Sequence, residues 1–203
     1  ADSFPLGGSH LLHPISPRVL HFCGKKATII IICKPQWPGA EREKPMQPVF
    51  IINPTAGKLD ASVALIPQIH AAASRAGVKP IVEITRRPGH ACDLAAKYAA
   101  SGEEVALYAC GGDGTLNEVL QGVIGCPNAA VGCVPCGSGN DYVRNFGTQA
   151  QFLDIDAQLA AKPFAVDLIQ TPQGYGIDIY AAGIDAQVAN GIPKWRRVPL
   201  CGG

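Results

Sequence analysis

The chain has 203 residues, 47% of them hydrophobic, which is enough to bury one full domain and part of another. Its 17 Lys and Arg residues nearly balance its 16 Asp and Glu residues. This balance excludes a strong overall field toward nucleic acid or an anionic membrane, so we expect no nucleic-acid partner. The apolar run at 27–33 is too short to span a bilayer, which takes about 20 residues.

Residues 1–45 contain clustered Pro, Gly and His without sustained helical or strand periodicity. Met46, the only methionine of the chain, directly precedes the first convincing strand. We therefore expect residues 1–45 to be an unstructured extension or a mis-assigned upstream reading, and Met46 to be the natural start.

From Val49 onward, short apolar runs that predict strands alternate with segments whose apolar residues recur at helical spacing. In chain order, the pattern predicts a strand at 49–52, a helix at 61–76, a strand at 80–85, a helix at 91–100, a strand at 105–110, a helix at 116–123, a strand at 129–134 and a helix at 140–146. Continuously apolar strands that alternate with helices indicate a parallel sheet covered on both faces. The predicted fold class is α/β, and ligands on such sheets bind beyond the carboxyl ends of the strands.

The pattern changes after about residue 163. The runs at 164–169 and 175–181 predict two strands joined around Pro172 and Gly174, which is a hairpin more than a crossover. We expect residues 46–162 to form an α/β nucleotide-binding domain and residues 163–203 to begin a second, β-rich domain that is truncated.

The strongest motif is Gly-Gly-Asp-Gly-Thr-Leu-Asn-Glu at 111–118, which follows a buried-type strand and enters a helix. Its glycines let backbone N–H groups approach a phosphate, and the helix N-terminus then favours the anion. Asp113 is a candidate to hold Mg²⁺ through water, and Thr115 is a candidate donor to phosphate oxygen. The motif is neither G-x-G-x-x-G, because Asn117 stands at the third glycine position, nor a P-loop. The alternative is a tight turn with an aspartate cap.

Two further loops follow predicted strands. Asn-Pro-Thr-Ala-Gly-Lys at 53–58 could present backbone amides and the Lys58 charge to phosphate, although the same residues also make ordinary turns. Pro-Cys-Gly-Ser-Gly-Asn-Asp at 135–141 offers a hydroxyl, an amide and a carboxylate, or simply a helix cap. Thr85, which ends a strand before Arg86 and Arg87, is either a fourth site residue or part of a solvated turn.

The eight cysteines are scattered through apolar segments, which is typical of reduced thiols in a cytosolic protein. Cys133 and Cys136 have the spacing of a redox dithiol or half a zinc site. No second pair completes a metal site, and we assign no residue as a direct metal ligand.

The three loops, in this order, resemble the diacylglycerol kinase catalytic domain family, which includes bacterial lipid kinases and the sphingosine and ceramide kinases. The resemblance covers roughly residues 49–190. It implies an ATP-dependent transfer of the γ-phosphate to a lipid hydroxyl, first of all that of diacylglycerol, with Mg²⁺ near Asp113. It also implies that the ATP site is lined by Asn53, Pro54, Thr55, Ala56, Gly57, Thr85, Gly112, Asp113, Gly114, Thr115, Leu116, Asn117, Glu118 and Ser138.

The same resemblance implies that Asp167 and Asp185 face the interdomain cleft that receives the lipid hydroxyl, although both residues also suit turns or caps. It places a carboxylate general base and acidic Mg²⁺ ligands in a later β-sandwich, beyond residue 203. It implies a cytoplasmic protein that associates peripherally with a membrane carrying its lipid substrate, and it leaves homo-oligomerisation open.

Three alternatives remain open. NAD kinase shares the Gly-Gly-Asp-Gly-Thr motif, but the residues at 116–118 and 135–141 fit lipid kinases better. The chain could instead be a non-catalytic nucleotide-binding module. A thiol-redox protein built on Cys133 and Cys136 is the third alternative.

Overall fold

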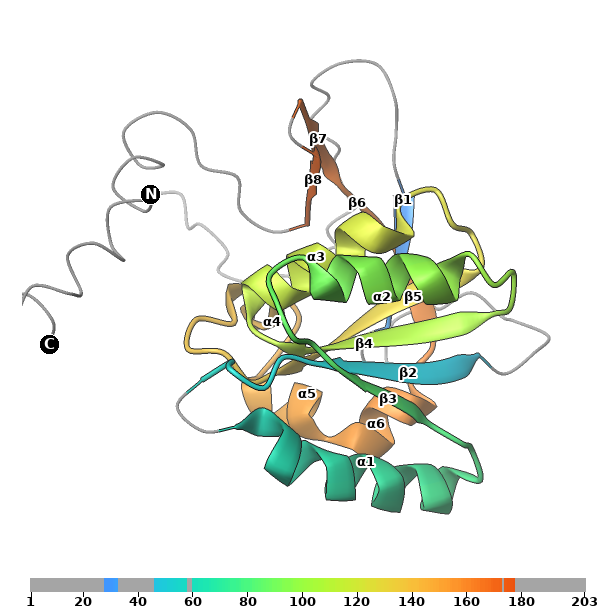
Figure 1. Cartoon of the computed structure of the whole chain (residues 1–203), viewed down its shortest axis with the longest axis vertical. Coiled ribbons are helices and arrows are strands. Elements are labelled where there is room, and N and C mark those ends of the chain that lie inside the picture. Colours follow the sequence, from blue (N-terminus) through green and yellow to red (C-terminus); the bar gives the residue numbers. More distant parts are fainter. Residues whose placement is uncertain (1–27, 33–45, 58–59, 173, 178–203) are drawn as a thin grey trace, which may run out of the picture.

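The computed structural model describes residues 28–32, 46–57, 60–172 and 174–177 (Figure 1). Its elements are, in chain order, β1 (Thr28–Ile32), β2 (Gln47–Ile52), α1 (Ala61–Ala76), β3 (Ile81–Ile84), α2 (His90–Ala99), β4 (Val105–Gly111), α3 (Asp113–Val123), β5 (Ala129–Pro135), α4 (Asp141–Arg144), α5 (Gln149–Leu153), α6 (Ile155–Ala160), β6 (Pro163–Asp167), β7 (Ile169–Thr171) and β8 (Gly174–Gly176).

The strands β3, β2, β4 and β5 lie side by side in that order and run parallel. Every residue of β4 and β5 is buried, as expected for strands with helices on both faces. The predicted α/β fold is therefore confirmed.

Helix α1 shows how local signals define an element. Asp60 caps its start by accepting the backbone N–H of Ser62 at 2.9 Å, and Gly77 ends it in the left-handed conformation with φ 67°. Leu65 and Ile69, one turn apart, are buried against the sheet. The predicted helix at 61–76 is confirmed at both ends.

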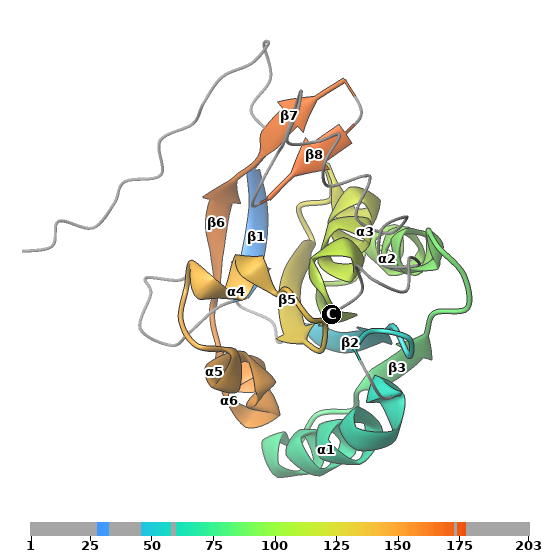
Figure 2. The same cartoon turned by 90° about the vertical axis from the view of Figure 1, so that its left-hand side faces the viewer.

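Two helical layers enclose the sheet (Figures 1 and 2). Helices α2 and α3 cover one face, where they cross so closely that a Cβ atom on Gly122 would collide with the carbonyl oxygen of Cys92. Helices α1 and α6 pack on the other face, where Phe50 stacks on Tyr108 with ring centroids 4.6 Å apart. Among the described residues, no helix is long and apolar enough to cross a membrane.

The sheet extends beyond the four predicted strands. β1 pairs in parallel with β5, and β6 pairs antiparallel with β1, so the full order is β3-β2-β4-β5-β1-β6. The expectation that residues 1–45 lack regular structure is wrong at 28–32; the other residues of that range lie outside the described ranges. β6 belongs to the main sheet, whereas the sequence placed it in the second domain.

A small hairpin follows β6. β7 pairs antiparallel with β8, with Thr171 opposite Gly174, and this pair stands apart from the main sheet beside α3 (Figures 1 and 2). The turn around Pro172 and Gly174 was predicted, but the strand predicted at 164–169 is divided between β6 and β7. Residues 178–181 of the second predicted strand lie outside the described ranges.

Candidate functional site

Four loops meet where parallel strands end. Backbone hydrogen bonds continue the sheet register into them: Thr85 N–H donates to the Ile52 carbonyl at 2.8 Å, and Asn53 N–H donates to the Cys110 carbonyl at 2.9 Å. Cys136 N–H donates to the Gly111 carbonyl at 2.8 Å. The loops after β2, β3, β4 and β5 therefore form one continuous edge, which is the expected ligand-binding edge of an open α/β sheet.

Asn53 organises the first loop and joins it to the second. Its side-chain oxygen accepts the N–H of Thr55 at 3.0 Å and the Thr55 hydroxyl at 2.8 Å. Its Nδ2 donates to the hydroxyl of Thr115 at 3.1 Å. Thr115 is buried, so this contact fixes the loop against the start of α3.

Helix α3 begins at Asp113 immediately after the glycine-rich loop. Its N-cap is Gly112, and no side chain caps the helix. The Gly112 carbonyl accepts the N–H groups of Thr115 and Leu116 at 3.0 Å and 3.1 Å. Backbone N–H groups of the first turn and the positive end of an 11-residue helix thus face the loop edge, a favourable environment for an anion.

Asp113 has an additional role that the sequence did not indicate. Its Oδ2 accepts the backbone N–H of Asp141 at 3.1 Å, and its Oδ1 accepts that of Tyr142 at 3.2 Å. These are the first two residues of α4, so Asp113 caps a helix that begins 28 residues later.

The third loop packs backbone to backbone against the other two. A Cβ atom on Gly137 would stand 2.6 Å from Gly112 Cα, and one on Gly57 would stand 2.5 Å from the Cys136 carbonyl oxygen. Gly57 also has φ 87°, which favours glycine. Asn140, in the left-handed conformation with φ 54°, closes the loop by accepting the N–H of Gly137 at 3.1 Å and donating to its carbonyl at 2.6 Å.

A pocket of about 380 Å³ opens at this edge, between the first loop, the segment after β3, and the starts of α2 and α3. The residues lining it are Asn53, Pro54, Thr55, Thr85, Arg86, Arg87, Pro88, Ala91, Thr115 and Glu118. Six of these lining residues belong to the predicted ATP site. The structure thus brings together residues that are up to 65 positions apart, from Asn53 to Glu118.

The remaining predicted site residues lie around this pocket without lining it. Ala56, Gly57, Gly112 and Ser138 belong to the adjoining loops, and Asp113 and Gly114 are the first two residues of α3. Leu116 is 3% exposed and belongs to the core between the sheet and α3. Asn117 is exposed and accepts a hydrogen bond from Gln121 at 3.2 Å. Leu116 therefore supports the site from the core and offers no side-chain surface to a ligand.

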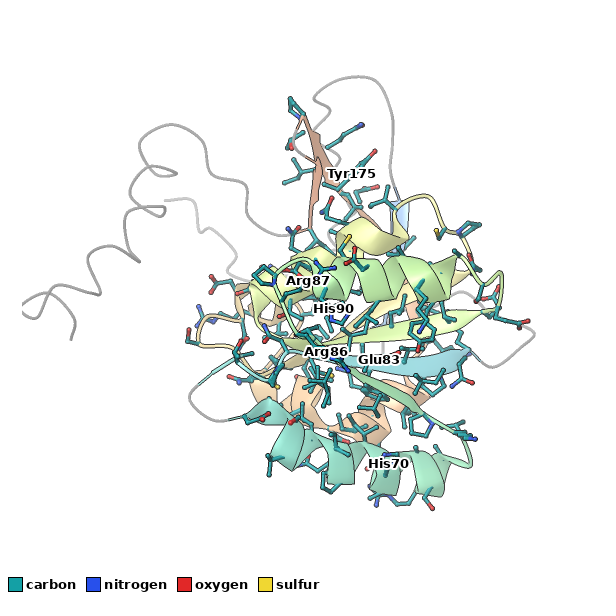
Figure 3. The ribbon with its side chains drawn as sticks, viewed as in Figure 1. His70, Glu83, Arg86, Arg87, His90 and Tyr175 are labelled. Carbon is teal, nitrogen blue, oxygen red and sulfur yellow. The ribbon has the colours of Figure 1, made fainter. Side chains whose placement is uncertain are left out.

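Arg86, Arg87, Pro88 and Ala91 line the pocket but were not among the predicted site residues. Figure 3 shows both arginines beside His90, where β3 ends and α2 begins. Arg87 pairs with Asp93 at 2.5 Å, whereas Arg86 makes no ion pair with any described residue. The sequence did contain a signal for these pocket residues, because two adjacent arginines follow the carboxyl end of a predicted strand, where ligands bind in parallel sheets.

The side chain of Glu118, a residue of α3, contacts the start of α2. Its Oε2 accepts the N–H of Ala91 at 3.3 Å, and α2 has Gly89 at its N-cap with no side-chain cap. A carboxylate already stabilises this helix end. A second anion there would meet the Glu118 charge, so this side of the pocket suits a hydrogen-bond donor.

The geometry does not support a dithiol built on Cys133 and Cys136. Cys133 belongs to β5, which ends at Pro135, and Cys136 directly follows it; three extended residues span about 10 Å between Cα atoms. Cys133 is buried with α2 and α3, whereas Cys136 packs with the α1 side of the sheet. Burial also raises the pKa of the Cys136 thiol, which disfavours the reactive thiolate.

Of the other residues singled out in the sequence, Asp167 is described, and it lies away from the loop edge. Asp167 is opposite Thr28 at the end of β6, which is the amino edge of β1 and the edge of the sheet away from the loops. The second domain expected on the other side of an interdomain cleft lies largely outside the described residues, so the expectation that Asp167 faces that cleft stays a prediction. Lys58 and Asp185 lie outside the described residues.

Within the described residues, no three His, Cys, Asp or Glu side chains are grouped so as to hold a metal ion. Asp113 is nonetheless compatible with Mg²⁺ bound through water. Each of its carboxylate oxygens accepts one backbone N–H and retains a further lone pair. Such an ion would depend on waters and substrate phosphates for its other ligands.

Comparisons with known proteins identify the family of the chain. The family model of the diacylglycerol kinase catalytic domain matches residues 47–171. A diacylglycerol kinase of Staphylococcus saprophyticus is 32% identical over 147 residues, which cover 71% of this chain and 48% of the relative. A protein of Chromohalobacter salexigens named "Probable lipid kinase YegS-like" is 29% identical over 152 residues, with 71% and 49% covered. The chain spans about half the length of these relatives.

A solved structure of a diacylglycerol kinase from Bacillus anthracis is also similar. Its TM-score is 0.46 at 24% identity, and the match covers 59% of this chain and 43% of the solved one. The family match at 47–171 includes all the predicted site residues and all ten residues that line the pocket. The chain belongs to the diacylglycerol kinase catalytic domain family.

Proposed function

We propose that this chain is the nucleotide-binding part of an ATP-dependent lipid kinase, which transfers the γ-phosphate to a lipid hydroxyl and, with diacylglycerol as acceptor, forms phosphatidic acid. The observation that carries the proposal is the glycine-capped start of α3 beside a pocket of about 380 Å³. A helix start without a side-chain cap favours phosphate, and the adjoining pocket has room for a nucleoside.

The charges around the pocket support one orientation of the nucleotide. Glu118 already stabilises the start of α2, so the base and ribose, which offer hydrogen-bond donors, lie on that side. The phosphates lie toward Gly112 and Gly137, where two backbones approach each other without Cβ atoms. Arg86, which is exposed and makes no ion pair with described residues, contributes attraction for the negatively charged ligand.

Phosphoryl transfer depends mostly on positioning and charge neutralisation. A bound Mg²⁺ would supply positive charge that offsets the charge of the phosphates. Asp113 would hold waters of that ion while its carboxylate keeps the start of α4 in place. Asn53 and Thr115 would keep the first loop and the start of α3 in register around the ligand.

Diacylglycerol is a membrane lipid, and the acceptor therefore reaches the enzyme at a membrane surface. We place the protein in the cytoplasm and in peripheral contact with that membrane. The names of the relatives from Staphylococcus and Chromohalobacter support diacylglycerol first and another lipid alcohol second.

The experiment measures two quantities on the same protein. Nucleotide binding is measured by calorimetry with ATP and Mg²⁺. Phosphate transfer from labelled ATP is measured with diacylglycerol in mixed micelles. Labelled phosphatidic acid supports the proposal, and transfer to NAD⁺ without transfer to lipid would replace it with NAD kinase activity. Binding without transfer to any acceptor would identify a non-catalytic nucleotide-binding module.

A further inference from the structure

The β7–β8 hairpin is too small to be ordered by its own pairing. Each strand has three residues, and an isolated two-stranded hairpin is marginally stable in water. Its order therefore depends on contacts with the rest of the protein. Tyr175 supplies one such contact, because its side chain packs partly buried against the core between the sheet and α3.

Gln121 of α3 supplies the second contact. Its Nε2 donates to the Tyr175 carbonyl at 2.6 Å, and its Oε1 accepts the Tyr175 N–H at 3.1 Å. The side-chain amide thus satisfies both backbone groups of Tyr175 on the side of β8 that faces away from β7, as a neighbouring strand would. Figure 3 shows Tyr175 on the hairpin beside α3.

Gly174 permits this approach. It has φ 137°, and a Cβ atom there would stand 2.7 Å from Gln121 Oε1. A larger residue at this position would be strained and would displace the Gln121 amide from Tyr175.

The same Gln121 amide also contacts the glycine-rich motif. Its Nε2 donates to Asn117 Oδ1 at 3.2 Å, one helical turn earlier. This bond orients the Asn117 amide, so that its oxygen faces Gln121 and its Nδ2 faces away. A single side chain therefore links residue 117 of the motif to residue 175 of the hairpin.

We propose that Gln121 is a positioning residue that couples nucleotide occupancy of the motif at 111–118 to the order of the β7–β8 hairpin. The inference rests on the proposed function, because it requires a nucleotide at this motif. Asn117 does not line the pocket, but its side chain is exposed and it directly precedes Glu118, which does line it. A nucleotide that extends from the pocket to the Asn117 amide also fixes Gln121, and through it the two backbone groups of Tyr175. By linkage, an ordered hairpin favours nucleotide binding by the same factor.

Hydrogen exchange of the peptide that contains Tyr175 tests the coupling, with and without ATP and Mg²⁺. We expect nucleotide to slow exchange at Tyr175 by about five- to tenfold in the parent chain, which corresponds to the usual size of coupling between sites. In Gln121→Leu, exchange without nucleotide is faster and the nucleotide-dependent change is lost. Gln68→Leu, a matched change at an exposed position of α1, keeps the parent behaviour.

The outcomes separate this proposal from the proposed function. If the parent chain binds ATP but exchange at Tyr175 does not respond, the coupling is wrong and the nucleotide site stands. If the parent chain binds no nucleotide, the proposed function and the coupling both fail. A full nucleotide response in a folded Gln121→Leu protein also overturns the role of Gln121. Gln121→Glu, which keeps the acceptor for Tyr175 N–H but loses the Nε2 donor, is expected to lose the response as well.

Discussion

The carboxylate of Asp113 accepts the backbone N–H of Tyr142 at 3.2 Å. A residue of the glycine-rich motif therefore stabilises the start of α4, the helix that follows the loop after β5. The neighbouring N–H of Asp141 binds the second carboxylate oxygen at 3.1 Å. Asp113 thus has a structural duty as well as its expected role near Mg²⁺. Loss of activity after its replacement would not by itself reveal which duty was lost.

Replacing Asp113 should therefore reduce stability as well as function. We expect Asp113→Ala to lower the free energy of unfolding by about 1–2 kcal/mol, because two backbone donors lose their acceptor. Asp113→Asn, which keeps one acceptor oxygen, should cost about half as much. Urea denaturation measures both. Asp141→Asn is the control, since that carboxylate makes an exposed ion pair with Arg144 and should cost at most about 0.5 kcal/mol. Equal stability of the parent and Asp113→Ala would show that the cap contributes nothing.

Alanine substitutions at two glycines allow the cost of backbone strain to be distinguished from the cost of a steric collision. Gly57 and Gly77 both have positive φ, at 87° and 67°, but only a Cβ atom on Gly57 meets another group, the Cys136 carbonyl oxygen at 2.5 Å. We expect Gly77→Ala to cost about 1 kcal/mol through backbone strain alone. Gly57→Ala should cost about 1 kcal/mol or more beyond that, through the collision, and should weaken ATP binding. Thermal unfolding and calorimetry test both changes. The same loss in the two variants would mean that the loop moves away without cost.

Much of the fold could be predicted because its signals are local. Helix α1 is bounded by Asp60 and Gly77, and its buried residues recur at helical spacing. β1 could not be predicted in this way. It is a short run of one Thr and four Ile, and whether such a run pairs depends on partners 100 residues later in the sequence. The pairing of β6 with β1 depends on that same strand, so its place in the main sheet was missed as well.

The site was predictable as far as it consists of loops after parallel strands. Asn53, Thr85 and Thr115 meet because the carboxyl ends of such strands meet. The second function of Asp113 and the link between Gln121 and Tyr175 could not be predicted. Each is a contact between a side chain and backbone groups far away in the sequence, 28 and 54 residues apart, and leaves no periodic pattern.

The pair of Glu83 on β3 and Tyr98 on α2 should make stability depend on pH. The Tyr98 hydroxyl donates to Glu83 Oε1 at 2.5 Å, and this bond, with a smaller contribution from Lys97, lowers the pKa of Glu83 below its ordinary value of 4.5. A carboxyl whose pKa is lowered by folding stabilises the protein above the unfolded pKa, and this contribution is lost as the pH falls through the folded pKa.

We therefore expect Tyr98→Phe to cost about 1 kcal/mol at pH 7 and progressively less below about pH 4.5, where Glu83 becomes protonated. Urea midpoints of the parent and Tyr98→Phe between pH 7 and pH 3 measure the difference. A difference that stays constant across this range would mean that the phenol stabilises the fold by packing alone.

Arg86 offers a test of the charge on the nucleotide pocket. It directly follows β3, lines the pocket and makes no ion pair with described residues, whereas Arg87 beside it is paired with Asp93. We expect Arg86→Gln to weaken ATP binding by about three- to tenfold at low salt, and by less at high salt, because an exposed charge is screened. Stability should change little, since no ion pair with described residues is lost. Calorimetry at two ionic strengths provides the measurement.

Lys79→Gln, an equal change of charge just before β3 and away from the loop edge, should leave the affinity within about twofold. If both variants bind ATP equally well, the pocket does not use the Arg86 charge, and if both lose affinity equally, only the net charge of the protein matters.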